Sequence, residues 1–164
     1  MDRLIRSIPQ VGRLSWIGCS PERRAAVEPR DRVELQVGTG LEGDHHARSG
    51  KGSRQVTLVQ AEHLPVIATL LGRDQVDPGE LRRNLVVSGI NLWALRKLRF
   101  RVGDVLLEGT GPCPPCSRME EIFGAGGYHA VRGHGGICAR VLEGGEVRLG
   151  DAVRLDEVSG SSAG

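Results

Sequence analysis

The chain has 164 residues and a formal net charge of +2, which is enough for one domain with a sizeable core. Aromatic residues make up only 3% of it, so we do not expect an aromatic stacking surface for nucleic acid. No apolar run is long enough to span a bilayer, and Met1–Gln10 lacks the apolar centre of a signal peptide. We therefore expect a cytoplasmic protein with no membrane or nucleic-acid partner. Its four cysteines do not form a disulfide scaffold and should be largely reduced.

The predicted elements are short strands that often follow one another directly. We expect strands over Val11–Gly18, Val33–Val37, Gln55–Val59, Asn84–Val87, Arg99–Val102, Val105–Glu108, Ile137–Leu142 and Glu146–Leu149. Helical spacing favours one longer helix in Ala61–Leu71, which Pro65 should delay, and a short helix after Asp77. This order does not alternate as βαβ units do. It predicts a mainly β protein with short helices, a β-barrel with helical insertions. We expect one domain over residues 1–156 and a flexible tail over 157–164.

One internal echo supports a barrel. The turn at Gly103-Asp104 and its flanking residues resemble the turn at Gly150-Asp151, 47 residues later. We interpret the two turns as two corners of one barrel. A single similarity of this kind does not indicate a repeat array.

A glycine-rich loop, Gly38–Gly52, contains Gly-x-Gly-x-x-Gly at Gly38–Gly43, the spacing of a dinucleotide-binding fingerprint. That mechanism needs a helix that begins at the third glycine. The next residues, Asp44 to Gly52, have no helical apolar pattern. We interpret the segment as a functional loop.

The segment that we expect to carry the chemistry contains Cys113 and Cys116, separated by two prolines. Ser117 and Glu120 have the spacing of a capping box, so a helix should run from here to Phe123 and end at Gly124. Cys116 would then precede a helix N-terminus, which favours a thiolate. Such a thiolate is either a nucleophile or a soft metal ligand.

Two other interpretations of these thiols remain open. Cys113-x2-Cys116-x12-His129-x4-His134 has zinc-finger spacing, but the glycines around the histidines disfavour the helix that a finger needs. The two cysteines also resemble a dithiol redox motif, although the βαβ setting is missing and the prolines stiffen the loop.

Two further segments contain candidate ligands. Arg82-Arg83-Asn84 lies between a short helix and a strand, where it could bind phosphate or form a solvated arginine pair. Arg132 to Arg140 is a glycine-rich approach to a strand, and glycines such as Gly136 let a backbone come close to a ligand. We interpret Cys138 as a small buried apolar residue.

Together and in this order, these motifs resemble the MOSC domain family, named after the C-terminal domain of molybdenum cofactor sulfurase. The resemblance covers about Val11 to Leu155, and no single motif carries it. The segments that carry it are Gly40–His45, Arg82–Gly89, Val102–Asp104, Pro115-Cys116 and Gly135–Asp151, the last of which resembles the family's closing hairpin.

The resemblance implies a β-barrel-like fold and either sulfur handling or binding of a pterin molybdenum cofactor. Cys116 would be the catalytic residue and the molybdenum ligand. Arg82 and Asn84 would hold the cofactor's phosphate or pterin. The other candidate cofactor-binding residues are Asp44, His45, Arg132, Gly136 and Arg140.

On this basis the expected activity is molybdenum-dependent reduction of small N-hydroxylated compounds, with electrons from a separate donor protein. The alternative is a sulfur carrier in which Cys116 receives persulfide sulfur from a donor protein. We expect no residue of this chain to bind pyridoxal phosphate, because the sulfurase half that uses it has no counterpart here. Cys113 would assist Cys116 or resolve its adducts.

Overall fold

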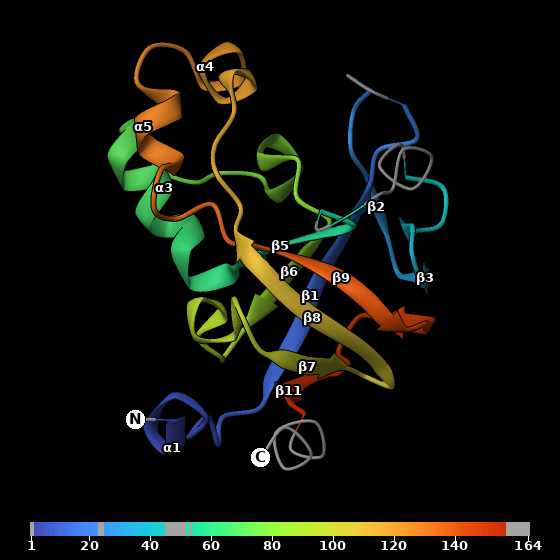
Figure 1. The fold of residues 1–164 in the computed structure, drawn as a ribbon. Helices are drawn as coiled ribbons and strands as arrows, with labels where there is room; N and C mark the ends of the chain where they lie inside the picture. The colour runs from blue at the N-terminus through green and yellow to red at the C-terminus, as the bar shows by residue number, and fades with distance from the viewer. Residues whose placement is uncertain (1, 23–24, 45–51, 53, 157–164) are drawn as a thin grey trace.

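Seven strands close into a β-barrel, as predicted (Figure 1). The computed structural model describes residues 2–22, 25–44, 52 and 54–156. Within these residues the sheet runs β11-β7-β8-β9-β5-β6-β1, and a β11–β1 pairing closes it. The barrel strands are β1 (Gly12–Cys19), β5 (Val56–Gln60), β6 (Leu85–Ser88), β7 (Arg99–Val102), β8 (Val105–Pro112), β9 (Ile137–Glu143) and β11 (Ala152–Leu155). The short β2 (Glu28–Arg30) extends the sheet beyond β1.

A second, smaller sheet has the order β10-β3-β4. Its strands are β3 (Arg32–Gln36), β4 (Gly40–Leu41) and β10 (Gly145–Arg148). Its buried residues, which include Leu35, Leu41 and Val147, join the barrel core. The small sheet therefore closes part of the barrel interior from solvent.

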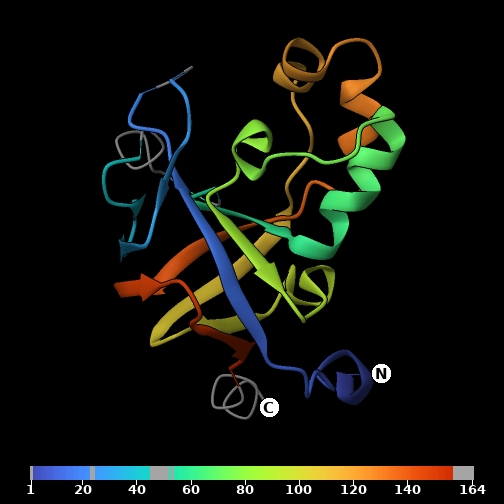
Figure 2. The ribbon, with the colours of Figure 1, turned by 180° about the vertical axis from the view of Figure 1, so that it is seen from behind.

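The helices gather at one end of the barrel, away from the two termini (Figures 1 and 2). They are α3 (Leu64–Leu71), α4 (Ser117–Phe123) and α5 (Gly127–Val131), while α1 (Asp2–Ile5) lies at the N-terminus. The short 3-10 helices are η1 (Ala61–His63), η2 (Pro78–Leu81) and η3 (Leu92–Leu95). Within the described residues no helix is long and apolar enough to cross a bilayer.

Two apolar clusters hold these parts together. One fills the barrel, with Phe100, Leu58 and Leu107 among its fully buried members. The other packs α3, α4 and α5 against the outside of β5 and β6, through residues such as Ile67 and Met119. Burying a side chain of this size contributes about 1.5–3 kcal/mol, so the helical end is a packed part of the protein.

The two glycine-aspartate turns lie side by side, as expected for two corners of one barrel. The backbone N–H of Gly103 donates to the carbonyl of Ala152 at 2.8 Å. A Cβ on Gly103 would lie 2.8 Å from a carboxylate oxygen of Asp151. The echo therefore marks two turns that meet where β11 pairs with β7.

The expected hairpin between residues 137–142 and 146–149 is wrong. Both strands exist, but β10 pairs with β3, while β9 pairs with β8 and β5. A Cβ on Gly144 would lie 2.6 Å from the carbonyl oxygen of Leu35, so the chain turns closely over β3 at this glycine. That close approach directs the next strand onto the small sheet.

The predicted capping box at Ser117 is also wrong. The N-cap of α4 is Cys116, and Ser117 is the first helical residue. The Glu120 carboxylate instead accepts hydrogen bonds from the N–H groups of Gly126 (3.1 Å) and Tyr128 (3.0 Å). Glu120 therefore caps the next helix, α5. The predicted end of α4 at Phe123, with Gly124 following at φ 84°, is confirmed.

Candidate functional site

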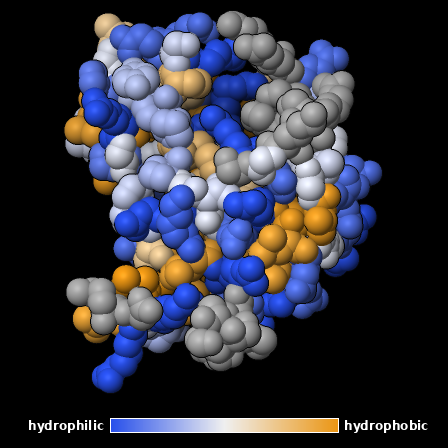
Figure 3. All heavy atoms as spheres, in the orientation of Figure 1, coloured by the Kyte–Doolittle hydropathy of each residue, from blue (hydrophilic) through white to orange (hydrophobic). Residues whose placement is uncertain are grey.

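Three segments that are distant in the sequence meet beside the helical end of the barrel. They are the Asp44 region, the Arg82–Asn84 segment and the thiol loop, which we define as Cys113–Cys116. The thiol loop continues from the end of β8 and leads into α4 (Figure 1). Figure 3 shows the surface hollowed at this end, with hydrophilic residues gathered in the hollow.

Arg82 is held in an unusual backbone conformation. Its φ is +58°, and it is the one non-glycine residue with positive φ in the described part of the chain. This left-handed geometry costs a residue with a Cβ about 1–2 kcal/mol. The guanidinium donates to the carbonyl of Ala25 at 2.7 Å and to Oγ of Ser20 at 3.1 Å. Local strain combined with a fixed charged side chain is typical of functional positions.

Asp44 and Asn84 are both buried and contact each other. Oδ1 of Asp44 accepts from the backbone N–H of Ser20 (2.8 Å) and from Nδ2 of Asn84 (3.4 Å). Oδ1 of Asn84 accepts from the backbone N–H and the hydroxyl of Thr57, each at 3.1 Å. Nδ2 of Asn84 also donates to the carbonyl of Gly18 at 3.2 Å. Asn84 therefore ties β1, β5 and β6 together and positions Asp44 next to Ser20, the residue that Arg82 binds.

Arg118, in the first turn of α4, brings a second cation toward Arg82. Burial lowers the pKa of the Arg82 guanidinium, and the positive charge of Arg118 lowers it further. The charges of Asp44 and Cys116 act in the opposite direction on the same pKa. Two arginines, one carboxylate and one thiol thus share a local electrostatic environment.

Arg118 also has an unsatisfied donor. Its Nε is buried and, among the described residues, is the one buried side-chain polar atom without a hydrogen-bond partner. The carboxylate oxygen with which it forms an ion pair, Oε2 of Glu121, is 3.9 Å away, which is too far for a hydrogen bond. A buried donor without an acceptor costs about 1–3 kcal/mol. An anion between the two arginines would provide the missing acceptor.

Cys116 is exposed at the N-cap of α4, whereas Cys113 is buried. The position of Cys116 before a helix is thus as predicted. The Cys116 side chain makes no capping hydrogen bond to the first turn of α4. The exposed thiol is therefore accessible to a ligand from the solvent side.

The buried side chain of Arg83 connects the thiol loop to the neighbouring backbone. It is 2% exposed, and its Nε donates to the carbonyl of Gly135 at 2.8 Å. Its Nη2 donates to the carbonyl of Pro114 at 3.4 Å, and its Nη1 to that of Leu81 at 3.1 Å. Arg83 is thus an internal strut, and the interpretation of Arg82-Arg83 as a solvated pair is wrong.

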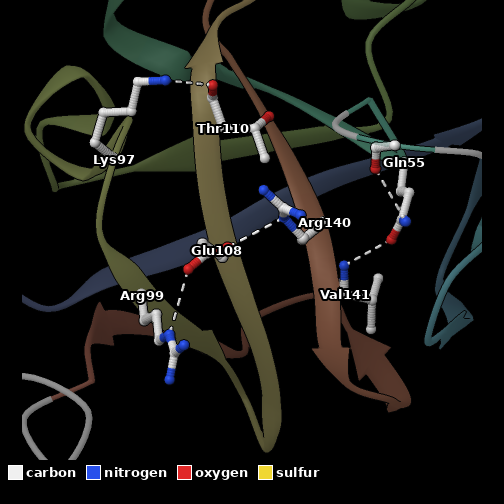
Figure 4. A network of polar contacts seen from close by, with 8 residues as sticks. Gln55, Lys97, Arg99, Glu108, Thr110, Arg140 and Val141 are labelled. Carbon is white, nitrogen blue, oxygen red and sulfur yellow. Dashed lines mark hydrogen bonds and ion pairs between the residues drawn. The ribbon is translucent and has the colours of Figure 1, made fainter. Parts of the chain in front are cut away.

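The remaining candidate cofactor-binding residues lie away from this site or have a structural role in the backbone. Gly136 has φ +89°, and a Cβ on it would lie only 1.8 Å from the carbonyl oxygen of Leu58. A glycine is therefore needed here for the close contact with β5, and not for a ligand. Arg132 is exposed at the end of α5. Arg140 forms an ion pair with Glu108 at 3.1 Å on the outer surface of β8 and β9 (Figure 4). His45 lies outside the described residues.

The four zinc-finger positions do not converge. Cys113 is buried and Cys116 is exposed, while the ring of His134 lies against that of His63 at 5.9 Å between centroids. Across the residues that the structure describes, no group of three or more His, Cys, Asp or Glu side chains could hold a metal ion. The sequence spacing alone was therefore misleading.

Two residues of the site were missed by sequence reasoning. Arg118 lies between Ser117 and Glu120, the two residues of the expected capping box, and belongs to no motif of its own. Ser20, which contacts both Arg82 and Asp44, lies in a polar loop with no motif. The one sequence pattern that could have indicated Arg118 is Cys116-x-Arg118, which places an arginine in the first turn of the helix.

Comparisons with known proteins agree with this architecture. The model of the MOSC domain family matches residues 42–154, more than half of the chain. The YuaD protein from Bacillus subtilis superposes with a TM-score of 0.77 at 20% identity, covering 89% of this chain and 96% of that one. YiiM from Geobacillus stearothermophilus gives a TM-score of 0.71 at 17% identity, covering 88% and 75%. YiiM from Escherichia coli gives 0.66 at 20%, covering 88% and 69%. No curated protein matches the sequence significantly.

Proposed function

Because the chain belongs to the MOSC domain family, we propose that it binds a pterin molybdenum cofactor and reduces small N-hydroxylated compounds. The observation that supports this most strongly is the pair Arg82 and Arg118 beside the exposed Cys116. The residues fit such a cofactor, because a thiolate is a soft metal ligand and an arginine fork binds phosphate.

In this proposal each residue has a separate task. Cys116 supplies the sulfur ligand to the metal. Arg82 and Arg118 bind the anionic group, with the unsatisfied Nε of Arg118 as one of the donors. Asp44 and Ser20 keep the Arg82 guanidinium in place, through the bonds described above. When bound, the cofactor supplies the two-electron redox chemistry that N–O bond cleavage requires, and a separate protein supplies the electrons.

The test is cofactor content in protein purified from a host that makes molybdenum cofactor. We expect molybdenum and fluorescent pterin in the wild type, loss of molybdenum in Cys116→Ser, and loss of both in Arg82→Ala. The matched control is Cys113→Ser, which removes the buried thiol of the same loop and should keep both. Reduction of an N-hydroxylated amidine with a reduced viologen as electron donor should follow the molybdenum content.

Two results would contradict the proposal. Equal molybdenum in wild type and Cys116→Ser would exclude this thiol as the ligand. Protein without molybdenum or pterin that instead gains a sulfur atom on Cys116 when incubated with a cysteine desulfurase would support the sulfur-carrier alternative. Intact mass spectrometry before and after a thiol reductant measures that sulfur directly.

A further inference from the structure

Behind the exposed thiol lies a pair of buried thiols. Cys113 is 3% exposed and Cys138 is 6% exposed, and their side chains form a hydrogen bond. This hydrogen bond and burial both raise the pKa of Cys138. Neither thiol has a task in the proposed binding of the cofactor.

The strand register explains why the two thiols meet. Cys138, on β9, is paired with Gly111 on β8, and the N–H of Cys113 donates to the carbonyl of Gly136 at 2.9 Å. Each cysteine thus faces a glycine on the opposite strand. The two cysteines are diagonal neighbours on one face of an antiparallel ladder, and no side chain on the facing positions separates them.

The end of β8 is also irregular. The register between β8 and β9 shifts between Gly109 and Gly111, and the backbone of Gly111 has φ +148°. A bulge of this kind disrupts the ladder locally and leaves a residue without a regular partner. The small movement that brings two hydrogen-bonded sulfurs into bonding distance is therefore available here.

We propose that Cys113 and Cys138 form an intramolecular disulfide by exchange with a small-molecule disulfide, fastening the thiol loop to β9. In the first step the Cys113 thiolate displaces one thiol from the small disulfide and forms a mixed disulfide. Cys138, whose raised pKa keeps it protonated, then attacks the sulfur of Cys113, and its proton passes to the second thiol as that thiol leaves. The two cysteines lose two electrons and two protons, and the small disulfide is reduced to two thiols.

The bridge would close a loop that contains α4 and α5. Closing a loop restricts the unfolded chain, which stabilises the folded protein. It would also fix the position of Cys113 relative to β9, and with it the start of the loop that carries Cys116. The inference does not depend on cofactor binding, and its test uses the protein without cofactor.

The experiment equilibrates the full chain with glutathione disulfide, blocks free thiols with iodoacetamide, and maps the tryptic peptides by mass spectrometry. Trypsin cleaves after Arg118 and Arg132, so Cys138 is released on a peptide separate from that of Cys113 and Cys116. We expect these two peptides to be joined in the main oxidised species. They should remain joined in Cys116→Ser, which leaves Cys113 as the partner.

The control variants are Cys19→Ser, which should form the same linked peptides, and Cys138→Ser, which should not. The oxidised wild type should melt at a higher temperature than the reduced protein, and dithiothreitol should reverse the shift. Exposed Cys116 makes Cys116→Ser a variant that we expect to fold normally. If Cys116→Ser gives no linked peptides, or if the wild type carries only glutathione on Cys116, the proposal is wrong.

Discussion

The buried guanidinium of Arg83 joins two loops, because its Nε donates to the carbonyl of Gly135 at 2.8 Å while its Nη2 contacts the carbonyl of Pro114. Gly135 precedes β9, and Pro114 belongs to the thiol loop. A Cβ on Gly135 would lie 2.8 Å from the carbonyl oxygen of Cys113 and 3.0 Å from Nη2 of Arg83. The position of the thiol loop in the candidate site thus depends on the buried Arg83.

We predict that Arg83→Ala lowers the free energy of unfolding by about 2–4 kcal/mol, since buried carbonyl groups would lose their hydrogen-bond donors. Urea unfolding followed by circular dichroism measures this. The control is Arg13→Ala, an exposed arginine whose bond to the carbonyl of Gly150 is 3.5 Å long, which should change stability by less than about 0.5 kcal/mol. A loss below about 1 kcal/mol in Arg83→Ala would show that Arg83 is not a structural strut.

Gly136→Ala should be among the most damaging single changes. The added methyl group would meet the carbonyl of Leu58 at 1.8 Å, and φ at this position is +89°. We expect a loss of about 3 kcal/mol or more, or insoluble protein. In Gly72→Ala the backbone is also left-handed, with φ 70°, but a Cβ meets nothing within 4 Å. That control should cost only the conformational strain, about 1 kcal/mol. Similar losses in both variants would mean that the contact with β5 is unimportant.

Arg118→Gln should separate stability from binding. Removing one of two neighbouring cations relieves repulsion of Arg82 and removes the unsatisfied Nε. We therefore expect the cofactor-free protein to be more stable by about 1 kcal/mol or more, since the cost of the unsatisfied donor and the repulsion both disappear. Cofactor content after purification should fall at least several-fold. A variant that loses stability and retains its cofactor content would contradict the role given to Arg118.

The fold was largely predictable, because barrel strands depend on local alternation and on turn residues. The strands at residues 12–19, 56–60 and 99–102 all appear within one or two residues of their predicted positions. Partner choice was not predictable for β10, since it follows from the close approach of Gly144 to β3. A sequence contains the turn residues but not the surface onto which the turn directs the chain.

The sequence indicated three segments of the candidate site that are near one another in the structure. The Asp44, Arg82 and Cys116 segments do lie together, and the coulombic influence of Asp44 and Cys116 on Arg82 reflects this. The roles of Arg83 and Arg118 could not be predicted, because burial and neighbouring charge decide between a strut, a ligand and a solvated arginine. These quantities exist only in three dimensions.

Glu120 provides a prediction for acidic pH. Hydrogen bonds from the N–H groups of Tyr128 and Gly126 lower its pKa below the ordinary value of 4.5. A lowered pKa in the folded state means that the stabilisation is complete above the unfolded pKa and is lost as pH falls through the folded pKa. In Glu120→Gln this acid-dependent part should disappear, while the exposed-strand control Glu34→Gln should behave as wild type. Urea midpoints from about pH 6 to about pH 3 measure it. Unchanged pH dependence in Glu120→Gln would rule out the capping role.

The most direct test of the central claim, that Cys116 ligates molybdenum, is X-ray absorption spectroscopy at the molybdenum edge. We predict one protein-derived sulfur ligand in the wild type in addition to those of the cofactor. Cys116→Ser, reconstituted with cofactor in vitro, should show one sulfur fewer, and Cys113→Ser should show the wild-type number. An unchanged sulfur count in Cys116→Ser at equal molybdenum content would contradict the account.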